Sequence, residues 1–470
     1  MTQPGTSSVR RAAASGTSMP GRFKNRVDSI GRTSPARLAL GVFATVIALV
    51  TGLLSLPAAT STGQRAPFAD ALFTATSAVC VTGLVTVDTA TYWSGLGEAI
   101  ILVAIKVGGL GVITLAALLG LAVSRRIGLT GRLLAQRETK AQRLGEVGTL
   151  LRVVIGTSLV LEAILTVVLF PRFLTLGEEP GQALWHSVFY AISAFNNAGF
   201  ASHPGGLPEG SVGDWWLCIP ILTGVFVGSV GFPVLVAVGP RWRSPSRWGL
   251  HAQLTVTTTL VLLALTVVML GAFEWANPRT LGGLEADEKI LAVLFMSVMP
   301  RSGGFATLDV GAMNGETWLA LDVLMFIGGG SASTAGGIKV TTLAVLFLAT
   351  VAEARGNTDV EAFGRRIPSV TMRLSVTVLL VGATLVIVAT MALQAITDEP
   401  LDIVLFEVIS AFATCGLSQG LTPDLPDAGK YLLTGLMFLG RTGTMSVAAA
   451  LALREHPKMY RLAEERPIVG

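Results

Sequence analysis

The sequence has little charge. Aspartate, glutamate, lysine and arginine make up 14% of its 470 residues, against about a quarter in a typical soluble domain. Hydrophobic residues make up 51%, and the mean hydropathy is +0.65. So few charged groups cannot cover a soluble protein of this size, and the composition predicts an integral membrane protein. Eight apolar runs are long enough to cross a bilayer as helices, near residues 37–58, 95–123, 150–170, 215–239, 252–272, 317–350, 374–395 and 430–453.

Cysteine and histidine are also scarce. The three cysteines lie in or beside apolar segments, which argues against a disulfide framework; they are Cys80, Cys218 and Cys415. The four histidines are scattered, with no metal-ligand spacing and no nucleophile–base pair; they are His186, His203, His251 and His456. The sequence therefore predicts no enzyme and no cofactor in this chain.

Positive charge is distributed unevenly between the connections. The two termini and every second connection carry 24 of the 34 lysines and arginines, and the other connections carry five. The positive-inside bias therefore predicts a multi-pass plasma-membrane protein with both termini in the cytoplasm. Residues 1–36, rich in serine, glycine and arginine, are predicted to form a disordered cytoplasmic arm, and residues 457–470 a cytoplasmic tail.

Five basic residues remain at membrane depth, where a charge is expensive and is a functional hypothesis by default. They are Lys106, Arg152, Arg301, Lys339 and Arg441. Arg152 lies near a helix end, so we expect it to snorkel to the interface. Arg301 is expected to form a structural salt bridge with a carboxylate that the sequence does not identify. Lys339 could anchor a loop or face an ion path.

Four similar phrases recur along the chain, each after a stretch too short to span a bilayer. The phrases are SAVCVTGL at 77–84, SAFNNAGF at 193–200, SVMPRSGGF at 297–305 and SAFATCGL at 410–417. Their glycines are Gly83, Gly199, Gly304 and Gly416, separated by 116, 105 and 112 residues. A second glycine follows in the helix that comes after each phrase, here called the outgoing helix; these glycines are Gly108, Gly228, Gly328 and Gly440. This regular spacing predicts four copies of one unit.

Each unit reads as a helix, a re-entrant half-helix, an extended loop and a second helix. Because non-helical backbone at membrane depth must be buried in protein or line a water-filled path, the four loops are expected to meet. The predicted fold is an all-α integral membrane protein of four M1–P-loop–M2 repeats with pseudo-fourfold symmetry around one central pore. The predicted repeats are residues 37–124, 148–240, 250–351 and 372–456.

The loops are candidates for a potassium selectivity filter. Potassium crosses a membrane when backbone carbonyls replace its hydration shell, and glycine reaches the required conformations cheaply. Any one of these glycines more often serves close helix packing, but four in register favour a filter. The predicted filter residues are Val81, Thr82, Gly83, Asn197, Ala198, Gly199, Ser302, Gly303, Gly304, Thr414, Cys415 and Gly416.

The run GGGSASTAGGIKVTT at 328–342 superficially resembles a phosphate-binding loop. That motif needs a lysine and a hydroxyl residue directly after its last glycine, but here Ile338 precedes Lys339 and Val340 follows it. Small residues instead predict a flexible intramembrane gating loop at 328–338, with Arg441 adding an electrostatic barrier. The predicted gate residues are Gly328, Gly329, Gly330, Ser331, Ala332, Ser333, Thr334, Ala335, Gly336, Gly337, Lys339 and Arg441.

Over residues 37–456 the chain resembles the Trk/Ktr/HKT superfamily of potassium transporters. The resemblance is carried by the loop phrases at 77–84, 193–200 and 410–417, the GGGSASTAGGIK run, LGRTGT at 439–444 and GRRIP at 364–368. The single span before the first loop is similar to the KtrB branch. Glycine in all four loops resembles the potassium-selective members, since sodium-selective members have serine in the first loop, where this chain has Gly83. The resemblance also implies a polar uncharged residue at position 106, where this chain has Lys106.

The resemblance further implies partners. A KtrB-like subunit would form a homodimer on cytoplasmic KtrA-like RCK subunits that bind ATP and ADP, and sodium would stimulate uptake or be coupled to it. The basic stretch at 124–143 is a candidate docking surface, although the positive-inside bias accounts for most of its charge. A rival interpretation from the residues alone is a secondary transporter of a small solute, with a midplane site at its broken helices. We expect no contact with nucleic acid.

Overall fold

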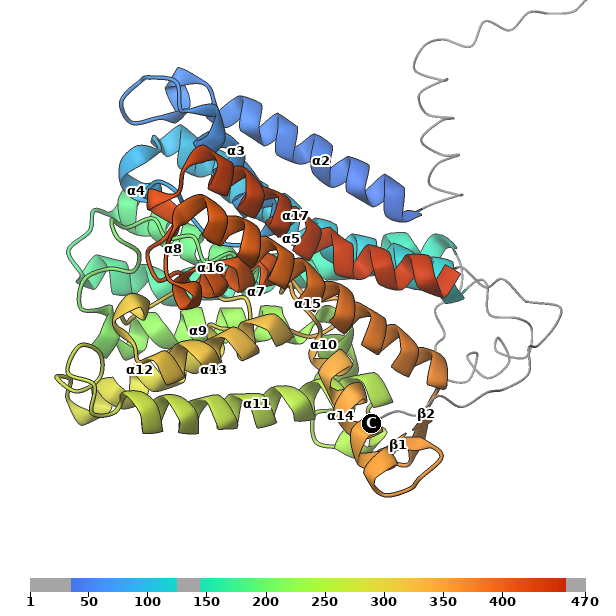
Figure 1. Cartoon of the computed structure of the whole chain (residues 1–470). Coiled ribbons are helices and arrows are strands. Elements are labelled where there is room, and N and C mark those ends of the chain that lie inside the picture. The colour runs from blue at the N-terminus through green and yellow to red at the C-terminus, as the bar shows by residue number, and fades with distance from the viewer. Residues whose placement is uncertain (1–34, 125–143, 454–470) are drawn as a thin grey trace, which may run out of the picture.

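The structure is a computed structural model that describes residues 35–124 and 144–453. The predicted arm up to residue 34, the basic connection at 125–143 and the tail after residue 453 lie outside the described residues, as do His456 and the side chain of Arg152. The described chain is mostly helical, and its long helices run roughly along one direction (Figure 1). This arrangement agrees with the membrane class predicted from composition.

The long helices correspond to the apolar runs. They are α2 (Pro35–Leu54), α5 (Gly95–Ser124), α7 (Leu144–Thr175), α11 (Leu250–Glu274), α15 (Ser369–Thr397) and α17 (Asp427–Leu453), while the run near 215–239 holds the shorter α9 (Trp215–Val230). Within the residues searched, the stretches 154–175, 250–274 and 369–397 are each long and apolar enough to cross a membrane alone. Many of their large apolar side chains face outward, among them Val268 at 67% exposure, as lipid contact requires.

Four shorter helices precede the repeated phrases. They are α3 (Phe68–Cys80), α8 (Pro180–Phe195), α12 (Ala286–Val298) and α16 (Leu401–Ala413). At 13 to 16 residues, and 1.5 Å per residue, none reaches across a hydrocarbon core of about 30 Å. Their starts carry helix-initiating signals, such as Pro180 in the first turn of α8 and the Glu285–Glu288 capping box of α12.

Two outgoing helices are interrupted. The sequence predicts one span over 215–239, but α9 ends at Val230, and the helical stretch Phe232–Arg241, which begins with α10 (Phe232–Val238), leaves at 96°. Gly231 has φ 99° and Pro233 follows in the first turn of α10, so a positive-φ glycine and a proline that starts a helix make the corner. In the third repeat, α13 (Gly315–Ile327) and α14 (Val340–Ala354) are separated by the glycine-rich segment.

Small elements complete the described chain. A hairpin of β1 (Val360–Ala362) and β2 (Arg365–Ile367) pairs Glu361 with Arg366 between α14 and α15, where the sequence analysis expected only a connection. The helical turns are η1 (Pro57–Ala59), α4 (Thr89–Tyr92), η2 (Ser211–Gly213), η3 (Gly239–Arg241), η4 (Pro245–Arg247), η5 (Val310–Ala312) and η6 (Thr422–Asp424).

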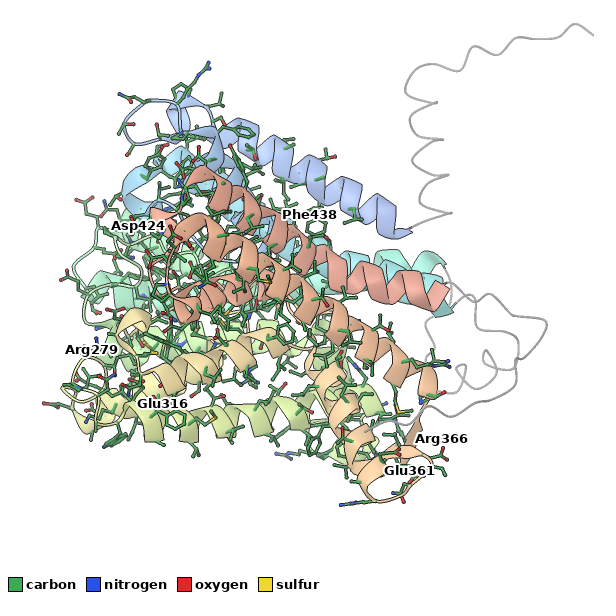
Figure 2. All side chains as sticks on the ribbon, viewed as in Figure 1. Arg279, Glu316, Glu361, Arg366, Asp424 and Phe438 are labelled. Atoms are coloured by element: carbon green, nitrogen blue, oxygen red, sulfur yellow. The ribbon has the colours of Figure 1, made fainter. Side chains whose placement is uncertain are left out.

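The half-helices lie inside the bundle and join neighbouring predicted repeats. Helix α3 packs against α5 of the first predicted repeat and α17 of the fourth, α12 packs against α9, and α16 packs against α13. Lys430 of α17 pairs with Asp70 of α3 at 2.7 Å. Charged residues occupy the two ends of the bundle: Asp424 and Arg279 are at one end, and Arg366 is near the other (Figure 2).

Candidate functional site

The four repeated phrases come together at the centre of the bundle, each against the next. A Cβ built on each phrase's glycine would lie between 2.3 and 2.8 Å from a backbone atom of a neighbouring loop. The first loop touches the second, the second the third, the third the fourth, and the fourth the first. The four glycines are Gly83, Gly199, Gly304 and Gly416. They form a closed ring in which no side chain fits between adjacent loops.

The backbone repeats the same pattern in all four loops. The residue two positions before each glycine has a φ of 47–71° although it carries a side chain, and the glycine itself has a φ of 69–96°. These four non-glycine residues are Val81, Asn197, Ser302 and Thr414. Each such conformation costs on the order of 1–3 kcal/mol and persists where the surroundings impose it. Four equivalent instances point to one function for the loops.

A serine at the start of each phrase holds three of the loops. Ser77 and Ser193 each donate to the carbonyl oxygen seven positions later at 2.7 Å, and Ser410 accepts from the amide six positions later at 3.1 Å. The third phrase is one residue longer, so Ser297 instead donates back to the Val293 carbonyl at 2.6 Å. The third loop is therefore held differently from the others.

The second set of glycines explains how the outgoing helices approach the half-helices. In three repeats, a Cβ at this glycine would lie between 1.8 and 2.1 Å from the carbonyl oxygen four positions before the loop glycine. These three glycines are Gly108, Gly228 and Gly440. In the third repeat, Gly328 has φ 61° and ends α13. Gly328, which corresponds in sequence to the other three glycines, thus begins the glycine-rich segment between α13 and α14.

The segment between α13 and α14 lies against three of the loops. The Thr334 hydroxyl donates to the Asn197 side-chain oxygen at 2.7 Å, and the Gly336 amide donates to the Ser302 hydroxyl at 3.2 Å. A Cβ at Gly336 would lie 2.0 Å from the Thr414 hydroxyl oxygen. Most of the segment is buried, so it is packed, where the sequence analysis expected a flexible loop.

Two cations hold this segment by its carbonyl oxygens. The guanidinium of Arg441, which is 2% exposed, donates to the Thr334 carbonyl. The Lys339 ammonium donates to the carbonyls of Ala335 and Gly336 at 2.7 and 3.2 Å. Lys339 therefore anchors the segment, the first of the two roles left open by the sequence.

The corner between α9 and α10 packs against the same segment. The Gly330 amide donates to the Ser229 carbonyl at 2.8 Å, and a Cβ at Gly231 would lie 2.7 Å from the Ser331 carbonyl oxygen. The unpredicted break in the second outgoing helix thus makes room for the predicted break in the third.

Arg301 does not form the predicted salt bridge. Its side chain is 2% exposed, and it donates to the backbone carbonyl of Thr259 in α11 at 2.9 Å. No carboxylate pairs with it among the side chains that the structure describes. The prediction was wrong because a helix carbonyl, which no sequence pattern reveals, accepts the hydrogen bond.

The charge of Lys106 is neutralised inside the protein. Its ammonium lies 2.5 Å from a carboxylate oxygen of Glu162 on α7 and 2.6 Å from the Ser158 hydroxyl. Glu162 is 5% exposed and also accepts from the Asn196 side chain at 2.9 Å. Glu162 is not among the residues predicted from the sequence, although a carboxylate inside the apolar run 150–170 is itself a signal of a buried partner.

Replacing Lys106 by methionine should destabilise the protein. The change leaves the buried Glu162 carboxylate without its cation, and breaking such a pair costs about 3 kcal/mol. We expect a melting temperature several degrees lower in detergent, measured by intrinsic fluorescence. The double variant Lys106→Met/Glu162→Gln should recover most of the loss, and a single variant as stable as the wild type would contradict a structural role for the pair.

Comparison with known proteins identifies relatives over nearly the whole chain. The family model described as TrkH, Cation transport protein, matches residues 40–461. The Ktr system potassium uptake protein B of Bacillus subtilis is 39% identical over 429 residues, covering 90% of this chain and 94% of the relative. The Potassium/sodium uptake protein NtpJ of Enterococcus hirae is 33% identical over 457 residues, covering 93% and 98%.

A solved structure has a similar fold. The crystal structure of the potassium transporter TrkH from Vibrio parahaemolyticus superposes with a TM-score of 0.69, covering 96% of this chain and 88% of the other at 17% sequence identity. At that identity the likeness concerns the fold alone.

Proposed function

Because the chain belongs to the TrkH family of cation transport proteins, which are transporters and not enzymes, we propose that it takes up potassium across the cell membrane through a central pore. The observation that carries the proposal is the closed ring of four loops. Each loop contributes a positive-φ residue and a positive-φ glycine, and a ring of extended loops can offer backbone carbonyls to a dehydrated potassium ion. The names of the two relatives, both uptake proteins for potassium, support potassium as the cargo.

The four predicted repeats are proposed to surround this pore with pseudo-fourfold symmetry. Support comes from the shared phrases, the shared φ pattern and the matching approach of the second glycines. The filter is assigned to the twelve residues predicted from the sequence, three in each loop. Their backbone carbonyls, and not their side chains, would contact the ion, since the two residues before each glycine differ between loops.

The segment between α13 and α14 is proposed to close the pore below the filter. Thr334 bonds to the second loop, and Gly336 contacts the third and fourth. Arg441 holds the segment in this position through the Thr334 carbonyl. In this state the guanidinium acts as a latch as well as an electrostatic barrier.

The mature assembly is proposed to be a homodimer on cytoplasmic nucleotide-binding subunits, with both termini in the cytoplasm. This follows from the resemblance to KtrB-like subunits and from the basic connections, one of which, at 125–143, lies outside the described residues. A stimulating or coupled sodium ion is supported by the name of the Enterococcus hirae relative, a potassium/sodium uptake protein. Opening would require the partner to pull the glycine-rich segment away from the loops.

The proposal is tested by rescue of a potassium-uptake-deficient bacterial strain at low external potassium. The chain expressed with a cognate nucleotide-binding subunit is expected to restore growth and rubidium uptake, and the chain alone to restore less. If the pair restores neither growth nor rubidium uptake although the protein is present in the membrane, the proposed potassium uptake is wrong. Rescue without potassium or rubidium accumulation would instead favour another solute.

A further inference from the structure

A cluster of two histidines and a carboxylate lies outside the proposed pore, at the end of the bundle where the second loop emerges. Glu178 stands between α7 and α8, His186 is on α8, and His203 follows the loop glycine Gly199 by four residues. The His186 Nδ1 lies 2.8 Å from one Glu178 oxygen, and the His203 Nε2 lies 2.9 Å from the other. Sequence spacing does not reveal the cluster, because folding brings together histidines that are 17 positions apart.

The three side chains can converge on one ion. One ligand atom from each residue lies within 4.8 Å of the other two. With zinc bonds of 2.0–2.1 Å, tetrahedral ligand atoms lie about 3.3 Å apart. The two histidine–glutamate separations are already shorter than this, and the two rings lie 4.2 Å apart between centroids. The three ligand atoms therefore lie within about 1.5 Å of the separations of a tetrahedral site.

Tyr190 orients one of the histidines as a metal ligand. Its hydroxyl donates to the Gly206 carbonyl at 3.0 Å and lies 3.0 Å from the His203 Nδ1. The phenol oxygen lies against Nδ1, so the His203 ring turns its Nε2 toward the Glu178 carboxylate. At 2.9 Å, Nε2 and the carboxylate oxygen can share a proton as an ion pair, or can both bind a metal ion.

Aromatic packing fixes the positions of both histidines. Phe173, which is fully buried, stacks on the His203 ring at 5.6 Å and meets the His186 ring edge-on at 5.9 Å. An apolar wall and an outer hydrogen bond of this kind commonly support histidine ligands.

We propose that Glu178, His186 and His203 bind one divalent transition-metal ion, best matched by Zn²⁺, on the face of the protein where the loops emerge. Two imidazole nitrogens and a carboxylate form a ligand set that zinc accepts, with water in the fourth position. The ion would join α8 to the segment after the second loop. That segment also meets the first repeat, because the Gly205 amide donates to Asp88 at 2.8 Å.

The test is a zinc titration of the full-length, chelator-treated protein in detergent, followed by calorimetry. We expect one zinc per chain for the wild type, and binding at least tenfold weaker for His186→Gln and for His203→Gln. Tyr190→Phe should weaken binding about tenfold, as expected for a residue that orients a ligand. His251→Gln, which changes a histidine on α11 outside the cluster, should bind like the wild type.

Two further measurements keep the proposal independent of misfolding and of transport. Co²⁺ in place of zinc should give the visible absorption of a four-coordinate site in the wild type and in His251→Gln, but not in His203→Gln. Zinc should raise the melting temperature of the same two proteins only. Equal zinc affinity in His203→Gln and His251→Gln, or no binding by the wild type at zinc concentrations far above those in cells, would overturn the proposal and leave the cluster a hydrogen-bonded brace.

Discussion

Gly83→Ser is expected to reduce potassium uptake about tenfold or more while leaving the protein folded. A Cβ at Gly83 would lie 2.5 Å from the Ala198 carbonyl oxygen of the next loop, at a φ of 95° that side chains rarely adopt. Relief of this contact must displace the second loop, because the clashing atom is backbone. Strain of about 1–3 kcal/mol in the conducting arrangement corresponds to roughly five- to 150-fold in rate. The measurement is rubidium uptake by the potassium-deficient strain.

A control glycine shows whether replacing glycine by serine reduces uptake wherever it is done or only in the proposed filter. Gly435 lies on α17, is exposed and has no atom within 4 Å of a Cβ built on it, so Gly435→Ser should transport like the wild type. Membrane levels of both variants are compared by immunoblot. Wild-type uptake and unchanged discrimination between potassium and sodium in Gly83→Ser would remove Gly83 from the proposed filter.

The features predicted best from the sequence are those that depend on hydrophobicity and on the residues next to one another in the chain. Half-helices too short to span a membrane are visible as apolar stretches that end in a glycine phrase, and the structure places α3, α8, α12 and α16 there. The mostly helical membrane class and the family are confirmed, and the three cysteines are free, as their apolar settings predict. In each case the signal is carried by the composition of the chain or by short runs of consecutive residues.

The features that were missed depend on contacts between distant segments. The corner at Gly231 is not evident from its own run, because glycine and proline are both common in membrane helices; the packed segment between α13 and α14 explains it. Arg301 and Lys106 find partners 42 and 56 residues away. His186 and His203 meet only because the chain after the second loop turns back over α8.

Deletion of residues 329–336 is expected to raise potassium flux severalfold in cells that lack the cytoplasmic partner. The segment leaves and returns at almost the same point, since a Cβ built at Gly337 would lie 3.4 Å from the Gly328 Cα. Consecutive Cα atoms lie 3.8 Å apart, so the shortened chain can join α13 to α14 with little strain. The deletion removes every contact of Thr334 and Gly336 with the loops.

Arg441→Gln provides a milder variant for the case in which the deletion does not fold. Removing the guanidinium donor from the Thr334 carbonyl weakens the latch, so flux without the partner should rise by a smaller factor. The decisive control combines the deletion with Gly83→Ser: if the extra flux passes through the loops, the combined variant must lose it. Extra flux that survives Gly83→Ser would reveal a leak beside the proposed filter, and a well-folded deletion with unchanged flux would mean that the segment does not gate the pore.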